Sequence, residues 1–228
     1  LVQHAVGDAH QRQPHQRHHR VQGQHRARHL AQAQAHDEAD AFVAENYAAL
    51  KREGFFKAHV PAELGGGGAS YREIAGVIRR LGACCSSPAL ALAMHTHIVA
   101  VNAWRWRHQG APADGMLKRV AAENLVLISS GGSDWLASAG RAVKAEGGFR
   151  ISARKAFASG VPAGDLLVTS AVYDDPQDGP TVLHFAVSLK AEGVNLRETW
   201  RAMGMRGTGS HDVELNEGFV ADAASSGK

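Results

Sequence analysis

The feature that most constrains this fold is a change of hydrophobic pattern near residue 123. Before this point, apolar residues recur every three or four positions, which is the period of an amphipathic helix. After it, short β-rich runs such as 166–173 and 181–189 alternate with clusters of turn residues. Helices followed by strands predict an α+β chain with two segregated domains: an N-terminal helical bundle over 37–123 and a small β-barrel or sandwich over 124–222.

Local signals indicate where individual elements begin and end. Ser70 and Glu73 form the sequence pattern of a capping box, so we expect a helix to begin directly after Ser70. The stretch 89–94 is apolar on all sides, which is typical of a helix at the centre of a bundle. Residues 55–61 are expected to form an extended link, and the glycine run 65–68 a flexible loop.

The first 36 residues differ in composition from the rest of the chain. They contain eight of the 14 histidines, eight glutamines and no aromatic residue. Such a segment cannot bury enough apolar area to offset the entropy of the chain, so disorder is expected. We favour translation of GC-rich DNA out of frame as the origin of this Arg/His/Gln/Ala composition. Metal capture by clustered histidines is the weaker alternative, because their spacing is irregular.

Charge and hydropathy narrow the possible partners. Residues 1–36 carry five arginines and one aspartate, a net charge of +4. The whole chain has a formal net charge of +3, so the residues after 36 sum to −1. A near-neutral body argues against nucleic-acid binding. No apolar run reaches the ~18–20 residues of a membrane span. The first residues are polar and lack the apolar central region of a signal peptide, so none is expected. We therefore expect a cytoplasmic protein that does not enter a membrane, with residues 223–228 as a short tail.

The two cysteines, Cys84 and Cys85, are adjacent in the sequence. Neighbouring cysteines rarely form a disulfide, because the ring that it closes is strained. Two cysteines alone also do not make a zinc site, so no metal is expected. We interpret them as small buried packing residues, with redox sensing as the alternative.

Two polar loops in the second half are candidate ligand contacts. Residues 129–134 directly follow a predicted strand, and residues 155–160 lie between two strands. Small residues let a ligand approach the backbone, hydroxyls donate to carbonyl or phosphate oxygens, and Phe157 offers a flat face. On these residues alone, a polar ligand with a planar ring and an ordinary pair of turns both remain open. The first reading requires that the two loops lie close together.

Five segments in this order resemble the acyl-CoA dehydrogenase superfamily over roughly residues 37–220. They are Gly54-Phe55 with Val60–Gly66, Ala89–His95, Ser129–Asp134, Lys155–Gly160, and Met203–Ser210 with Asp212–Leu215. Each motif is weak singly, but their order follows the same change from helices to strands. The resemblance implies a flavoprotein that binds FAD, with FMN as the alternative, and that forms a homo-oligomer at full length.

The resemblance also implies roles for individual residues. Ser129 stands where the family has a Thr at the flavin ring, and Ser133 would contact the flavin diphosphate or the acyl-CoA substrate. Phe157 would lie against the isoalloxazine, and Ser159 replaces the Thr whose hydroxyl reaches its reactive edge. Further cofactor contacts are expected at Ser130, Gly132 and Ala158. His95, on the apolar helix, is interpreted as a packed or hydrogen-bonded core residue, and a contact with the substrate is the alternative.

The reaction implied is α,β-dehydrogenation of an acyl-CoA thioester by proton abstraction and hydride transfer to flavin, followed by reoxidation by an electron-transfer partner. The family's carboxylate base lies on a third, helical domain, and no residue up to Lys228 matches it. No catalytic residue is therefore expected in this chain. We expect the chain alone to be inactive and to bind flavin weakly.

Departures from the family pattern leave two alternatives open. Residues 129–134 are shorter than the usual Thr-Glu-Pro-Gly-x-Gly-Ser-Asp, and Ala158 and Gly160 replace the usual Ile and Asn. One alternative is a two-component monooxygenase of the same fold, which receives reduced flavin from a separate reductase and acts on another small molecule. The other is a module that keeps the fold without chemistry.

Overall fold

The structure is a computed structural model that describes residues 34–222 and 225–227, with residues 133 and 225–227 described by their backbone only. The predictions made for the first 33 residues, and for the tail at 223, 224 and 228, lie outside the described residues.

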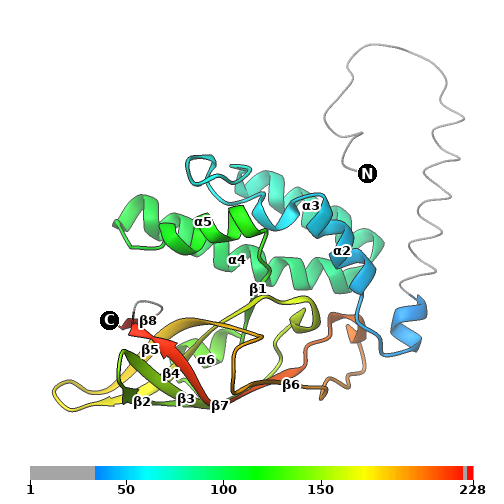
Figure 1. Cartoon of the computed structure of the whole chain (residues 1–228). Coiled ribbons are helices and arrows are strands. Elements are labelled where there is room, and N and C mark those ends of the chain that lie inside the picture. The colour runs from blue at the N-terminus through cyan, green and yellow to red at the C-terminus, as the bar shows by residue number, and fades with distance from the viewer. Residues whose placement is uncertain (1–33, 223–224, 228) are drawn as a thin grey trace, which may run out of the picture.

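The first half of the described chain is a layer of helices (Figure 1). The helices are α2 (Ala44–Arg52), α3 (Tyr71–Cys84), α4 (Ser86–Gln109) and α5 (Asp114–Glu123), with the short 3-10 turns η1 (Phe55–Lys57) and η2 (Ala62–Leu64). The predicted capping box is present: Ser70 Oγ accepts from the Glu73 backbone N–H, and the Glu73 carboxylate accepts from the Ser70 backbone N–H. The central helix α4 buries residues along most of its length, as its apolar sequence predicts.

None of the described helices, the 24-residue α4 included, is both long enough and apolar enough to cross a membrane.

The second half is a curled mixed sheet that packs beneath the helices (Figure 1). Its strands are β1 (Leu127–Ser129), β2 (Gly140–Ala145), β3 (Gly148–Lys155), β4 (Leu166–Asp175), β5 (Gly179–Ser188), β6 (Val194–Arg197), β7 (Asp212–Ala221) and β8 (Ser225–Gly227). The order across the sheet is β6-β7-β3-β2-β4-β5-β8, and β1 pairs in parallel with β4. The predicted α+β class is confirmed, with the strands forming a half-barrel.

Short helical pieces interrupt the second half: α6 (Gly132–Leu136), η3 (Val161–Ala163) and η4 (Arg206–Thr208). Helix α6 occupies the latter part of the first polar segment, where a loop was expected. The hairpin between β2 and β3 turns at Gly147, which has a φ of +71° and so uses the conformational freedom of glycine.

Buried contacts hold the helices to the sheet. The His95 Nε2–H donates to the Phe56 carbonyl over 2.7 Å, while the His95 Nδ1 accepts from the backbone N–H of Leu127 over 2.9 Å. One imidazole thereby joins α4, η1 and β1. A partly buried ion pair between Lys51 Nζ and Asp165 Oδ2, at 2.8 Å, ties α2 to the start of β4. The helices and the sheet therefore share one packed core.

The region before α3 differs from its sequence-based prediction. In place of an extended link, the chain forms the 3-10 turn η1. The glycine run 65–68 is a packed turn rather than a flexible loop, because the Gly67 N–H donates to the Lys57 carbonyl over 3.0 Å. A Cβ at Gly66 would lie only 2.2 Å from the Val60 carbonyl oxygen. The glycines let two stretches of backbone approach closely.

The two cysteines are free thiols and only partly buried. Cys85 packs against the core as expected, but neither cysteine is fully buried. Cys84 ends α3 and Cys85 links it to α4, where both line a hollow between the two helices and the segment around Met205.

Candidate functional site

The two polar loops meet at a buried ion pair. Lys155 Nζ lies 2.7 Å from Asp134 Oδ1, and the two side chains are 0% and 9% exposed. Ser130 Oγ donates to Asp134 Oδ2 over 2.6 Å, and Ser170 Oγ donates to the Asp134 backbone carbonyl over 2.7 Å. Asp134 belongs to the first loop segment and Lys155 to the second, so the predicted closeness of the two loops is confirmed.

The environment of this pair keeps both groups charged. Burial raises the pKa of Asp134, but hydrogen bonds from Lys155 and Ser130 outweigh it, and the pKa lies below its ordinary value. Burial lowers the pKa of the Lys155 ammonium, which the neighbouring carboxylate opposes. A buried ion pair stabilises a fold little compared with an apolar pair of the same size. We therefore interpret its main effect as fixing the relative position of the two loops.

Ser129 ends β1 with a buried hydroxyl. Its side chain is 1% exposed, and its Oγ has no hydrogen-bond partner among the described residues. An unsatisfied buried hydroxyl costs about 1–3 kcal/mol, so such a position needs a partner that the chain itself does not supply. A ligand with a hydrogen-bonding atom at this place would provide one.

The next residues lead into α6. Gly132 opens that helix, and a Cβ built there would meet no atom within 4 Å, so the space beside it is open. Ser130, in contrast, uses its hydroxyl on Asp134 and Thr169, which makes it a support of the ion pair. The side chain of Ser133 lies outside the described part of the structure.

Phe157 presents its ring outward from the second loop. Its φ is +58°, which is rare for a bulky residue, and 66% of it is exposed. The ring packs edge-on against Trp200, with 5.9 Å between the ring centroids. The next residue, Ala158, is fully buried, and its N–H donates to the His211 carbonyl over 3.0 Å. Ala158 therefore has neither its methyl group nor its N–H available for a cofactor.

Ser159 begins a short chain of buried hydroxyls. Its Oγ lies 2.9 Å from Ser210 Oγ, which in turn lies 2.7 Å from Thr208 Oγ1. Because either oxygen can donate in each pair, the three hydroxyl groups can reorient their protons toward a ligand. Thr208, Ser210 and Trp200 were not predicted as site residues. The run of small and hydroxyl residues around Thr208 was the available signal.

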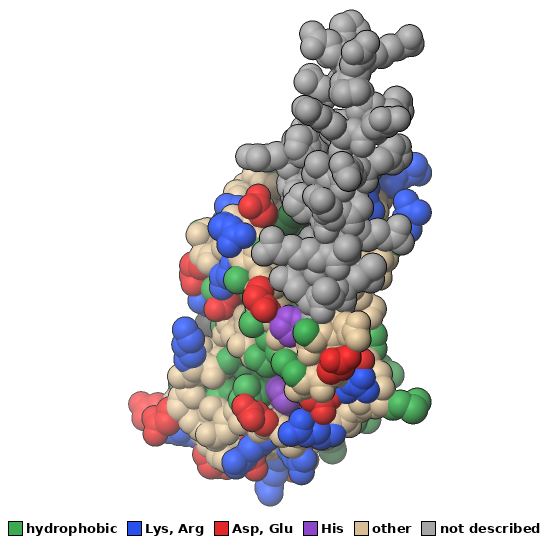
Figure 2. Space-filling view, turned by 90° about the vertical axis from the view of Figure 1, so that its right-hand side faces the viewer, with side chains coloured by type: hydrophobic (Ala, Val, Ile, Leu, Met, Phe, Trp, Pro, Cys, Tyr) green, Lys and Arg blue, Asp and Glu red, His purple; other side chains and the backbone are tan. Residues whose placement is uncertain are grey.

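The segment that carries these residues, between β6 and β7, is anchored to the start of the helical layer. Arg206 forms an ion pair with Asp37, and the Val43 N–H donates to the Gly207 carbonyl over 3.2 Å. Figure 2 shows the face seen from the right of Figure 1, where apolar side chains and histidines lie among charged side chains. The hydroxyl chain thus stands on a segment held at both the sheet and the helices.

His95 lies buried at the junction of the two halves, so its predicted role as a hydrogen-bonded core residue is confirmed. It is 2% exposed, and both ring nitrogens bond the backbone. Burial lowers its pKa from the usual 6.5 to about 4, so the ring is neutral at physiological pH. No ring nitrogen is left for a substrate.

The sequence matches two domain models of one family. Residues 18–109 match the acyl-CoA dehydrogenase N-terminal domain, and residues 129–217 match the acyl-CoA dehydrogenase middle domain. The first match starts inside the 1–36 stretch. The chain belongs to the acyl-CoA dehydrogenase superfamily, and it contains the helical and the β-domain of that fold.

Its relatives carry several activities. The amino sugar nitrososynthase RubN8 of Streptomyces rubradiris is 30% identical over 85% of this chain and 47% of its own length. The oxygenase component of an FADH2-dependent resorcinol hydroxylase from Rhizobium sp. is 27% identical over 81% of this chain and 42% of its own. Cyclohex-1-ene-1-carbonyl-CoA dehydrogenase of Geobacter metallireducens is 30% identical over 65% of this chain and 40% of its own.

A solved structure shows the same fold. KijD3, in complex with FMN and dTDP-3-amino-2,3,6-trideoxy-4-keto-3-methyl-D-glucose, superimposes with a TM-score of 0.78 and 25% identity, over 90% of this chain and 52% of that one. The chain thus spans about half the length of the relatives and the structure that it matches.

Proposed function

We propose that this chain forms the flavin-facing part of a two-component monooxygenase, which uses reduced flavin delivered by a separate reductase to oxidise a small molecule. One observation carries the proposal. Relatives that match more than four fifths of this chain include a nitrososynthase, a pigment production hydroxylase and an FADH2-dependent hydroxylase, whereas the putative acyl-CoA dehydrogenase YdbM of Bacillus subtilis matches 79% and the Geobacter metallireducens dehydrogenase 65%. This supports the alternative reading of the sequence better than acyl-CoA dehydrogenation.

The residues of the site fit a flavin. The Ser129 hydroxyl is buried without a partner among the described residues, which suits a hydrogen bond to a carbonyl or ring nitrogen of the isoalloxazine. Phe157 offers an exposed aromatic face, and Ser159 offers a hydroxyl backed by Ser210 and Thr208. FMN and FAD share the isoalloxazine, so these contacts serve either cofactor.

The cofactor and the residues of the chain would contribute different parts of the chemistry. A reduced flavin supplies the electrons that activate dioxygen. In our proposal, Ser129 and Ser159 orient the ring through its heteroatoms, and Phe157 shields one side of it from water. The buried Asp134–Lys155 pair keeps the two loops at a fixed separation. Fixed donors around a redox ring tune its reactivity without reorganising during the reaction.

Dehydrogenation of a thioester would need a carboxylate free to take the α-proton. The carboxylate of this site, Asp134, already accepts hydrogen bonds from Lys155 and Ser130. Its pKa lies below its ordinary value, which makes it a weak base. This residue therefore gives no support to the dehydrogenase reading.

The test compares flavin redox states. The chain is titrated anaerobically with FMN and FAD, each oxidised and dithionite-reduced, and the protein fluorescence is followed. We expect reduced flavin to bind at least about tenfold more tightly, a difference of about 1.4 kcal/mol. Preferential binding of oxidised FAD would support a dehydrogenase instead, and binding of neither redox state would support a module without chemistry.

A further inference from the structure

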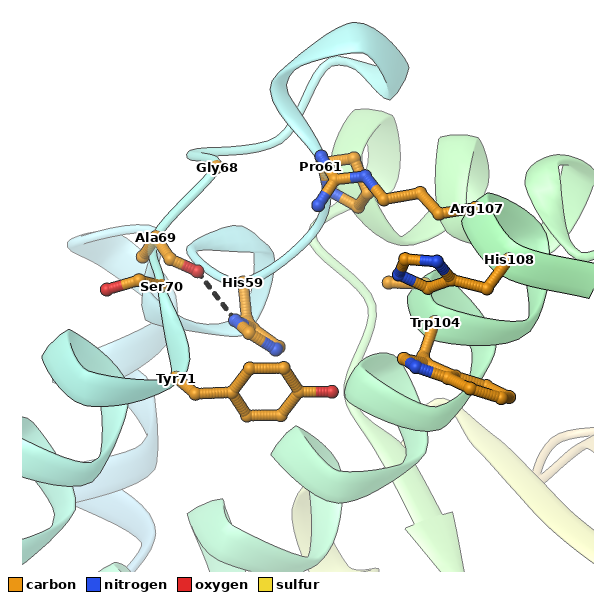
Figure 3. Close-up of a pocket in the computed structure, with 10 residues that line it drawn as sticks. His59, Pro61, Gly68, Ala69, Ser70, Tyr71, Trp104, Arg107 and His108 are labelled. Atoms are coloured by element: carbon orange, nitrogen blue, oxygen red, sulfur yellow. Dashed lines mark hydrogen bonds between the residues drawn. The ribbon is translucent and has the colours of Figure 1, made fainter.

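A second hollow lies in the helical layer (Figure 3). It has a volume of about 290 Å³ and separates the loop before α3 from the C-terminal half of α4. Pro61 and Ala103, both buried, form part of its lining. The polar loops of the flavin site contribute nothing to it, so it is a separate feature of the molecule.

Aromatic side chains form opposite walls of this hollow. Tyr71 stands on the loop side with 60% of its surface exposed, and Trp104 stands on α4 with 49% exposed (Figure 3). His59 packs edge-on against Tyr71 with 4.6 Å between centroids, and His108 packs against Trp104 at 5.4 Å. The Tyr71 hydroxyl donates to the carbonyl of Ala100 over 3.3 Å, which fixes its ring relative to α4. Two exposed aromatic walls suit a planar ring between them.

A guanidinium lies at the rim. Arg107 Nη2 lies 3.1 Å from Glu63 Oε2, and the two side chains are 47% and 61% exposed. An ion pair this exposed contributes little to stability, so a ligand carboxylate can take the place of Glu63. The planar fork of arginine binds a carboxylate through two hydrogen bonds.

An imidazole on the loop wall adds a polar group. His59 Nδ1 donates to the Ala69 carbonyl over 2.6 Å, and Figure 3 shows the other ring nitrogen turned away from Ala69. With Nδ1 as donor, Nε2 of the neutral ring is an acceptor.

The loop wall is preformed. The Gly68 N–H donates to the Val60 carbonyl over 2.9 Å, and a Cβ at Gly67 would lie 2.8 Å from the Ala58 carbonyl oxygen. This packed turn places His59 and Tyr71 before any ligand arrives. A wall that need not order on binding leaves more of the contact energy for affinity.

We propose that this hollow binds a small planar aromatic carboxylate of one or two rings. The ring lies between Tyr71 and Trp104, and the carboxylate displaces Glu63 from Arg107. The volume is at the lower end of small-ligand pockets, which span about 300–1,000 Å³, and it is too small for a whole dinucleotide. The proposal does not depend on the flavin site.

The experiment is a calorimetric titration of the chain with indole-3-carboxylate. Indole, which lacks the charge, and cyclohexanecarboxylate, which lacks the aromatic ring, are the comparison ligands. We expect saturable binding of indole-3-carboxylate, at least about tenfold tighter than either comparison ligand. Absence of saturable binding, or equal affinity for either comparison ligand, would overturn the proposal.

Variants locate the site. Trp104→Ala and Arg107→Gln are each expected to weaken indole-3-carboxylate binding about tenfold or more, whereas Trp104→Phe keeps a ring and most of the affinity. Arg119→Gln is the matched control, because Arg119 forms a similarly exposed pair with Glu123 on α5. Melting curves check that each variant is folded. Unchanged affinity in the two loss variants, or competition between FMN and indole-3-carboxylate, would place the ligand elsewhere and refute the proposal.

Discussion

At the scale of single residues, the proposed flavin site depends on the buried Ser129 hydroxyl, for which the described part of the chain offers no hydrogen-bond partner. If Ser129 is that contact, Ser129→Ala removes one hydrogen bond to the flavin and weakens FMN binding about five- to tenfold, or about 1 kcal/mol. The same change removes an unsatisfied polar atom from the core, so the melting temperature should hold or rise.

Fluorescence titration with FMN and thermal melting measure both effects. Ser152→Ala is the control, because Ser152 lies exposed on β3 and bonds Glu217. A destabilised Ser129→Ala variant with unchanged FMN affinity would show that the hydroxyl serves the fold and not a ligand.

The buried position of His95 predicts how the stability of the fold depends on pH. Its pKa is about 4 in the folded chain and near 6.5 when unfolded, so the unfolded state binds the extra proton first as pH falls. The stabilisation from neutral His95 is complete above pH 6.5 and is lost as pH falls toward 4, by up to about 3 kcal/mol.

Urea unfolding at pH 7.5 and pH 5 tests this for the wild type and His95→Gln. Other histidines with lowered pKa values, such as His97 and His211, add to the slope of both proteins. The difference between the two slopes therefore isolates His95. Equal slopes would refute the buried, neutral histidine.

The sequence predicted which chemical groups line the candidate site better than it predicted the directions in which their side chains point. Hydroxyls at Ser129 and Ser159 follow from the residues themselves. The inward direction of Ala158 does not, because it depends on the positive φ of Phe157. The contact between Ser159 and Ser210 also escaped prediction, since it joins positions 51 residues apart.

At the scale of elements, the Asp134–Lys155 pair sets how the two loops face each other. Lys155→Met or Asp134→Asn leaves the other charge buried without its partner, and each should cost about 3–5 kcal/mol of unfolding free energy. The double variant Lys155→Met, Asp134→Leu removes both charges and should regain most of this stability.

Measuring FMN affinity distinguishes a role of the ion pair in positioning the two loops from its effect on the stability of the fold. We expect the double variant to fold but to bind FMN at least about tenfold more weakly, because nothing then fixes the loop separation. Lys155→Arg, which keeps the pair, should retain part of the binding. A stable double variant with wild-type affinity would show that the ion pair has no positioning role.

Elements with strong local signals were predicted well. The capping box at Ser70 and the hairpin turn at Gly147 are each determined by a few adjacent residues. Helix α6 was missed, because a five-residue helix that begins at the second of two glycines carries little helical signal. The parallel pairing of β1 with β4 was also missed, since it joins distant segments.

At the scale of the whole molecule, the site needs both halves of the fold. The sheet provides the two loops, while the helical layer anchors the segment with Thr208 and Ser210 through Arg206 and Asp37. His95 joins the halves directly. The change from helices to strands, and hence the α+β class, was predictable from hydrophobic periodicity, whereas the contacts that join the two halves were not, because they connect distant segments.

The measurement that tests the central claim most directly is hydrogen–deuterium exchange of the chain with and without excess reduced FMN. If the two loops hold the ring, amide exchange should slow in residues 129–138, 155–160 and 206–211 together. Exchange in the turn at 175–179, between β4 and β5, should not change. Slowed exchange confined to other parts of the molecule, with both loops unaffected, would contradict the assignment of this site to a flavin.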